Sequence, residues 1–346
     1  MIIFSTGSEY FKIQGYCCND QHENGDSQFF EANIDEIVPK NSSYSYEFRD
    51  YVLDHNAPVH APVRVSADFI NRNDIVSVSP QTIENIILST ENPNEIPLDS
   101  SGRYTFDVLW CKAEGDWKSF YFCINDAITK KVVYDDIYPA ETAANLNKFF
   151  KEISPYLPKE KYITVDLDSK YKKSLKKYGF KRQLCLKHTP NAIKTNVNNN
   201  ITSYKKKGGK ISSKDREVIE EQKQQIIEMI LTTDLKLVDE KLNDLMDNFD
   251  LLHPCIQKLM NKMIIPNFDD FFRYLKVEGV EKTSNVSELN FQKALPKHVK
   301  RRMRIREGSL KRIWLKYTYR NKKFEEKENQ EELVVLTEMF INDDFI

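Results

Sequence analysis

Three acidic residues, far apart in the chain, stand in contexts that could bring them together at a metal site. Asp107 lies within the apolar stretch YTFDVLWC (104–111), and Asp166 ends the apolar stretch YITVD (162–166). Glu288 is followed by a block rich in Lys and Arg. An unpaired carboxylate in a buried strand is costly, so Asp107 requires a partner or a cation. Carboxylates that converge from separate elements could hold two divalent cations about 3.5–4 Å apart, as phosphodiester chemistry requires.

Each of these acids also has an ordinary structural explanation. Asp107 could face solvent from an edge strand, and Asp166 could belong to a solvated turn. Asp168 lies on the same side as Asp166 if the strand continues, so it is the alternative carboxylate. Asn285 stands three residues before Glu288, a spacing that predicts a capping box in which the glutamate only contacts the cap's amide. Spacing alone does not separate the two interpretations of Glu288.

The elements around these acids predict a mixed α/β sheet. Strands are expected over residues 104–111, 119–126, 131–138, 162–166 and 180–188, and helices over 139–153 and 169–179. Short turns join the first three strands, which should therefore pair antiparallel. Three antiparallel strands followed by α-β-α-β is the order of the ribonuclease H-like fold. In that fold the first strand lies beside the fourth, which would place Asp107 next to Asp166.

The rest of the chain divides around this core. The expected parts are a small helical N-terminal domain (1–90), a linker (91–102), the core (103–195 and 280–323), an all-helical insertion (196–279) and an acidic tail (324–346). Ser79 and Pro80 should open a helix in the N-terminal domain, because Ser is a good N-cap and Pro suits the first helical position. That helix belongs either to a degenerate helix-turn-helix or to an ordinary capped segment. Residues 190–210, rich in Asn and Lys, are expected to form a loop.

Charge is strongly segregated although the formal net charge is only −1. Residues 1–100 carry 16 acidic and 5 basic side chains, whereas residues 293–323 carry 13 Lys or Arg and a single acid. The local basic block indicates contact with nucleic acid. The side chains expected to hold phosphates are Lys300, Arg301, Arg302, Arg304 and Arg306.

Composition excludes several other classes of protein. No apolar run is long enough to span a bilayer, and the first residues lack the layout of a signal peptide. The six cysteines form no CxxC pair, so we expect neither a disulfide framework nor a zinc ribbon. Cys185 and His188 supply only half of a zinc site; His253 and Cys255 are the remaining candidates, and we do not expect a structural zinc.

The ordered set of motifs resembles the catalytic core of DDE/D transposases, and most closely the Mutator-like and archaeal insertion-sequence groups. The segments that carry the resemblance are TFDVLW, ITVDLDSKY, KRQLCLKHTPNAIK and TSNVSELNFQKALPKHVKRRMR. They cover roughly residues 104–195 and 280–312. Matched position by position, the resemblance implies that Asp107, Asp166 and Glu288 are the catalytic, metal-binding acids. Cys185 and His188 match the family's Cys-x-x-His, whose role would be auxiliary.

The resemblance implies a DNA transposase that cleaves and joins strands with two Mg²⁺ or Mn²⁺ ions. Its partners would be the terminal repeats of the element and target DNA, with a homodimer or larger assembly on DNA and no membrane. Its place would be the cytoplasm of a prokaryote, in association with the nucleoid. The alternatives are a catalytically inactive or domesticated DNA-binding protein on the same scaffold, and a structure-specific nuclease.

Overall fold

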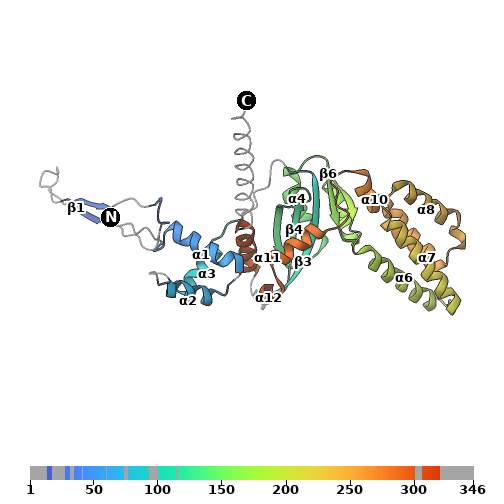
Figure 1. The fold of residues 1–346 in the computed structure, drawn as a ribbon, viewed down its shortest axis with the longest axis horizontal. Helices are drawn as coiled ribbons and strands as arrows, with labels where there is room; N and C mark the ends of the chain where they lie inside the picture. Colours follow the sequence, from blue (N-terminus) through green and yellow to red (C-terminus); the bar gives the residue numbers. More distant parts are fainter. Residues whose placement is uncertain are drawn as a thin grey trace, which may run out of the picture. The chain divides into compact units, whose positions relative to one another are not determined.

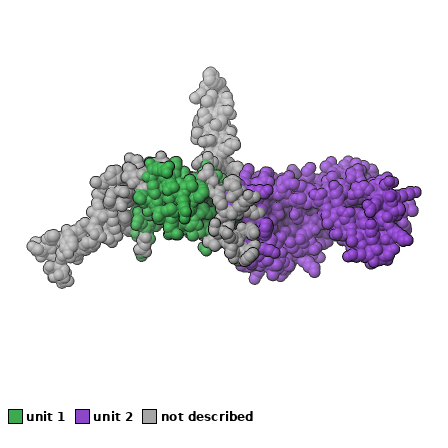
Figure 2. Space-filling model, turned by 90° about the horizontal axis from the view of Figure 1, so that it is seen from below, with its two compact units in different colours: residues 1–93, 305–346 green, residues 94–304 purple. Residues whose placement is uncertain are grey.

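The protein is described by a computed structural model over residues 14–17, 28–31, 35–40, 42–59, 61–73, 77–92, 100–113, 116–300 and 306–319. The chain forms two compact units (Figure 2). One comprises residues 1–93 and 305–346, and the other comprises residues 94–304. No described helix combines the length and the apolar character needed to cross a membrane.

The first unit is mainly helical. It contains a two-stranded antiparallel hairpin, β1 (Gln14–Cys17) and β2 (Gln28–Glu31), three helices, α1 (Tyr46–Val59), α2 (Val63–Asn73) and α3 (Pro80–Leu88), and a further helix over residues 306–319. As predicted, Ser79 caps α3: its hydroxyl accepts a hydrogen bond from the Thr82 amide. Residues 74–79 separate α2 from α3, more than the 3–4 residues of a helix-turn-helix turn, and α3 carries no Lys or Arg.

The helix over residues 306–319 lies in this first unit, although the sequence analysis assigned residues up to 323 to the sheet-containing core. Leu315 joins the apolar cluster formed by α1, α2 and α3. Arg312 pairs with Glu84 of α3 at 2.6 Å, and Lys316 donates to the Ala57 and Pro58 carbonyls at the end of α1. Basic side chains of this helix therefore satisfy an acid and helix-end carbonyls of the acidic N-terminal region.

The second unit is built on a five-stranded mixed sheet (Figure 1). Its strands are β3 (Arg103–Ala113), β4 (Asp116–Asp126), β5 (Val132–Tyr138), β6 (Lys161–Val165) and β7 (Phe180–Leu184). Their spatial order is β5-β4-β3-β6-β7. β3, β4 and β5 pair antiparallel, whereas β6 pairs parallel with both β3 and β7. This order confirms the predicted ribonuclease H-like arrangement.

Aromatic side chains fill the space between one face of the sheet and helices α4 (Ala143–Ile153) and α5 (Ser169–Lys177). Phe106 of β3 contacts Phe149 and Phe150 of α4, with ring centroids 5.4 and 5.1 Å apart. Because side chains alternate along a strand, Thr105 and Asp107 point to the opposite face. That opposite face receives α11 (Asn285–Ala294).

A helical insertion follows β7 and lies beyond the edge of the sheet that β6 and β7 form (Figure 1). It comprises α6 (Thr189–Lys206), α7 (Ser213–Leu231), α8 (Leu235–Asp247), α9 (Pro254–Leu259) and α10 (Phe268–Lys276). The expected loop over 190–210 is wrong, because α6 occupies most of it. Ile193 and Val197, one helical turn apart, are buried in the insertion's core, so this Asn-rich segment is an amphipathic helix.

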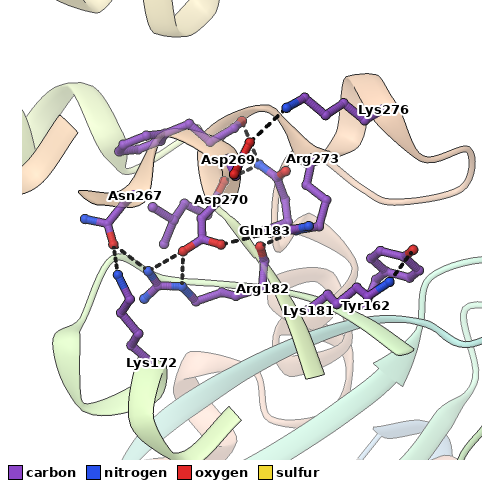
Figure 3. A network of polar contacts seen from close by, with 12 residues as sticks. Tyr162, Lys172, Lys181, Arg182, Gln183, Asn267, Asp269, Asp270, Arg273 and Lys276 are labelled. Atoms are coloured by element: carbon purple, nitrogen blue, oxygen red, sulfur yellow. Dashed lines mark hydrogen bonds and ion pairs between the residues drawn. The ribbon is translucent and has the colours of Figure 1, made fainter. Parts of the chain in front are cut away.

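Polar contacts fix the insertion to β7 (Figure 3). Arg182 of β7 pairs with Asp270 of α10 at 2.7 Å, and the Gln183 amide donates to the Phe271 carbonyl at 3.0 Å. Where the chain leaves β7 and where it returns toward α11, the Leu186 amide donates to the Lys282 carbonyl at 2.9 Å. The insertion therefore begins and ends at neighbouring points.

Candidate active site

Strand register places Asp107 beside Asp166. The parallel pairing of β3 with β6 aligns Tyr104 with Ile163 and Thr105 with Thr164. Continued by two residues, the same offset aligns Asp107 with Asp166, which directly follows β6. Two residues is one full period of a strand, so both acids share the face on which Thr105 and Thr164 lie.

A buried polar cluster seats α11 on that face. The Ser287 hydroxyl lies 2.9 Å from the Thr105 hydroxyl and accepts from the Asn125 side-chain amide at 2.9 Å. Asn290, one turn further along α11, donates to the Asn125 side-chain oxygen. All four side chains are almost fully buried. Their mutual hydrogen bonds fix the rotation of α11, and Glu288 follows Ser287 directly.

Glu288 does not form the capping box that its spacing allowed. Ser284, not Asn285, is the residue before the helix, and no side chain caps the helix amides there. The Glu288 carboxylate instead points to the Asp107 and Asp166 edge, where it adds to the electrostatic field on Asp107. Its Oε1 is buried and accepts no hydrogen bond from the described part of the chain.

An imidazole and an ammonium group lie between the acids. His188 Nδ1 is 2.8 Å from Asp166 Oδ1, and His188 Nε2 is 3.7 Å from Glu288 Oε1. The Lys187 ammonium donates to Glu288 Oε2, and this bond raises the pKa of Lys187. The imidazole therefore bridges two of the three acids that the sequence analysis selected.

Cys185 contacts the residue that precedes α11. Its side chain is fully buried, and Sγ accepts from the amide and the hydroxyl of Ser284, each at 3.4 Å. Ser284 immediately precedes α11, so this contact fixes the start of the helix that carries Glu288. Cys185 Sγ also lies within 4.8 Å of ligand atoms of Asp166 and His188. His253, by contrast, accepts from the Cys255 amide and caps α9.

Asp107 is the acid most affected by its surroundings. Burial raises its pKa to about 7, and the nearby Asp166 and Glu288 carboxylates contribute to the rise. A hydrogen bond from the Val108 amide and the proximity of His188 act in the opposite direction. In the absence of a cation, part of the Asp107 population therefore carries a proton at neutral pH.

Asp168, the alternative carboxylate, has a structural role in the fold. Its side chain caps α5 by accepting from the Lys170 amide at 3.0 Å, and it forms an ion pair with the Lys170 ammonium. The cap turns this side chain toward the helix and away from the three clustered acids.

The set of donors fits a hard divalent cation. Carboxylate oxygens from Asp107, Asp166 and Glu288 are the ligands that Mg²⁺ and Mn²⁺ prefer, and the buried Glu288 Oε1 accepts no hydrogen bond from the described residues. Burial, and after it the neighbouring carboxylates, raise the pKa of Asp107, and a bound cation would favour its charged form.

The basic block is only partly described. Lys300 ends the short helix α12 (Lys297–Lys300), of which only the backbone is described at that residue, and Arg301, Arg302 and Arg304 lie outside the described residues. Arg306 begins the helix of the first unit. Their assignment as phosphate contacts stays a prediction.

Sequence reasoning missed the residues that hold the site together, which are Thr105, Asn125, Lys187, Ser284, Ser287 and Asn290. Thr105 offered a signal, since it is polar, lies two residues before Asp107 and so shares its face. Ser287 and Asn290 are spaced three apart on the helix of Glu288, a spacing that predicts one common face.

Comparisons with known proteins agree with the resemblance seen in the sequence. No family model matches the chain. Among curated proteins, it is 25% identical over 250 residues to an "Insertion element ISM1 uncharacterized 48.3 kDa protein" of Methanobrevibacter smithii. The match covers 71% of this chain and 60% of that protein, so the chain spans about three-fifths of the relative's length.

Among solved structures, a chain of the simian T-cell lymphotropic virus intasome, in complex with the PP2A regulatory subunit B56 gamma, matches 47% of this chain and 65% of its own length. The identity is 10% and the TM-score is 0.23. A score this low carries no weight, and the fold assignment rests on the strand order.

Mn²⁺ binding distinguishes the two candidate aspartates. Asp166→Asn should abolish or strongly weaken Mn²⁺ binding, because it removes an anionic ligand at the point where the acids meet. Asp168→Asn should leave it near the wild-type affinity, since Asn caps a helix as well as Asp does. Titration of free Mn²⁺ by electron paramagnetic resonance measures both. If Asp168→Asn weakened Mn²⁺ binding more than Asp166→Asn did, Asp168 would be the metal ligand.

Metal-free stability should report the proton on Asp107. The folded-state pKa of about 7 exceeds the ordinary 3.8, so the folded protein holds this proton more tightly than the unfolded chain does. The resulting stabilisation is complete below the unfolded pKa and is lost as pH rises through 7. The free energy of unfolding should therefore fall by about 1 kcal/mol between pH 6 and pH 8.

Chemical unfolding in the presence of EDTA measures this loss. In Asp107→Asn it should disappear. Asp136→Asn serves as the control, because Asp136 lies on β5 and likewise accepts from the next backbone amide, that of Ile137. A wild-type loss that persists in Asp107→Asn would contradict the assignment.

The seat of α11 is testable through Ser287. Ser287→Ala removes the hydrogen bonds that the Ser287 hydroxyl forms with the buried Thr105 hydroxyl and the Asn125 side-chain NH₂ group, and it should lower the unfolding free energy by ~1–3 kcal/mol. Ser213→Ala, at an exposed position of α7, should change it by less than ~0.5 kcal/mol. Equal, small effects of the two substitutions would show that the buried cluster does not stabilise α11.

Proposed function

We propose that the chain is a DNA transposase of an insertion sequence, which cleaves and joins DNA strands with Mg²⁺ or Mn²⁺. The observation that carries the proposal is the convergence of Asp107, Asp166 and Glu288 on one face at one edge of a ribonuclease H-like sheet. The similarity to an insertion-element protein supports a transposase-type role.

In this proposal the three carboxylates hold the cations, which supply charge neutralisation for a water or 3′-hydroxyl nucleophile and for the leaving oxygen. Asp107 and Asp166 would bind a cation together, and Glu288 would reach the cations from α11. His188, already in contact with Asp166 at 2.8 Å, orients that carboxylate.

Lys187 has a separate role. Its ammonium neutralises Glu288 in the absence of a divalent ion. Because its side chain is half-exposed, it can turn outward and contact a DNA phosphate once a divalent ion takes over that neutralisation. The positive charge then stays within reach of the substrate.

A second candidate is a DNA-binding protein without catalysis on the same scaffold. The observation that favours it is that Asp166 and Glu288 already have partners: the His188 imidazole contacts Asp166, and the Lys187 ammonium pairs with Glu288. If these pairs persist on DNA, the acids remain neutralised without divalent ions and no cleavage follows.

One assay distinguishes the two candidates. A supercoiled plasmid that carries the ends of the element is incubated with the protein and Mn²⁺, and nicked, linear and joined products are resolved on a gel. The transposase proposal expects cleavage by the wild type, a loss of at least ~100-fold in Asp166→Asn, and retention in Asp136→Asn, whose carboxylate lies two strands away from β3.

Cleavage that persists in Asp166→Asn would refute the assigned site. Binding of the plasmid ends without cleavage by the wild type would favour the DNA-binding protein. Cleavage that needs no element ends would favour a structure-specific nuclease.

A further inference from the structure

A groove with a volume of about 580 Å³ lies between the sheet and the helical insertion. One wall begins with Leu167 and continues along the start of α5, and the end of β7 contributes Arg182. The other wall comes from the insertion, including Lys262 and Asn267. Leu167 directly follows Asp166, so the groove opens one residue from the candidate active site.

Neither of the two lysines that line the groove pairs with an acid of the described residues. Lys172 donates to the Pro266 carbonyl at 3.0 Å and to the Asn267 side-chain oxygen at 2.9 Å, both of which are uncharged (Figure 3). Lys262 is exposed, and no acid of the described chain lies within ion-pair distance of it. The acid in the lining, Asp168, is already paired with Lys170 at 3.0 Å.

The floor of the groove also carries a surplus of positive charge. Arg182, whose side chain is only 7% exposed, shares the Asp270 carboxylate with Arg273 (Figure 3). Two guanidinium groups thus have one carboxylate between them. Asp269, the next acid on α10, is engaged by Lys276 at 2.9 Å. A largely buried surplus charge favours the binding of an anion.

We propose that this groove binds the phosphodiester backbone of the DNA strand that flanks the scissile phosphate, with Lys172 and Lys262 as the phosphate contacts. The inference rests on the proposed function, which places the scissile phosphate at Asp166. Arg182 is held from two sides by Asp270 and Asn267 and forms the rigid floor. Lysine ammonium groups suit this site because they contact phosphates as point charges without a fixed orientation.

The salt dependence of DNA binding tests the proposal without any cleavage. The full-length protein is mixed in EDTA with a fluorescein-labelled duplex that ends in a single-stranded flank, and anisotropy gives the affinity at several salt concentrations. Each lost phosphate contact lowers the log–log slope by ~0.7–0.9. The double variant Lys172→Gln/Lys262→Gln should therefore lower the magnitude of the slope by about 1.4–1.8 relative to the wild type.

Two matched variants control for charge and folding. Lys214→Gln/Lys236→Gln removes two exposed lysines from α7 and α8 and should keep the wild-type slope. Lys172→Arg/Lys262→Arg retains the charge of the groove and should also keep it. Thermal unfolding of each variant establishes that the fold is intact.

An unchanged slope in the double glutamine variant would overturn the proposal. So would a variant that loses calorimetric binding of inorganic phosphate yet keeps the DNA slope, because the groove would then hold a free ion. Cleavage that depends on Asp166 can survive either result, and a changed slope can accompany absent cleavage. The two proposals therefore fail separately.

Discussion

The candidate site depends on the parallel pairing of β3 with β6. Within this pairing each residue of β3 faces the residue 59 positions later in the chain, as Thr105 faces Thr164. The same offset brings Asp107 to Asp166. A slip of one residue would send one acid into the aromatic core and leave the other on the α11 face, because side chains alternate along a strand. The aromatic packing around Phe106 opposes such a slip.

Crowding of like charge is the second constraint on this edge of the sheet. Burial and the neighbouring carboxylates raise the pKa of Asp107, while the His188 imidazole contacts Asp166 and the Lys187 ammonium pairs with Glu288. Beneath them, neutral hydrogen bonds among Thr105, Ser287, Asn125 and Asn290 set the position of α11 without adding charge. The site thus consists of crowded acidic side chains above a buried cluster of neutral, hydrogen-bonded side chains.

Local sequence patterns predicted the parts of the fold that depend on short-range chemistry. Apolar runs and tight turns gave the five strands and their order, and the positions of Asp107 and Asp166 followed from that order. Patterns failed where tertiary contacts decide the outcome. The Asn-rich α6 is stabilised by burial of Ile193 and Val197, and Asp168 acts as a helix cap although it stands two residues from Asp166. The position of the Glu288 side chain could not be derived from local patterns, because it depends on which residues α11 packs against.

The hydrogen bond from the Leu186 amide to the Lys282 carbonyl joins the two ends of the helical insertion. This hydrogen bond can form whatever the length of the chain between Leu186 and Lys282. The stretch between Asp166 and Glu288 can therefore change in length without displacing either acid, provided that its two ends still meet. The number of residues between these two acids is consequently no measure of the distance between their side chains.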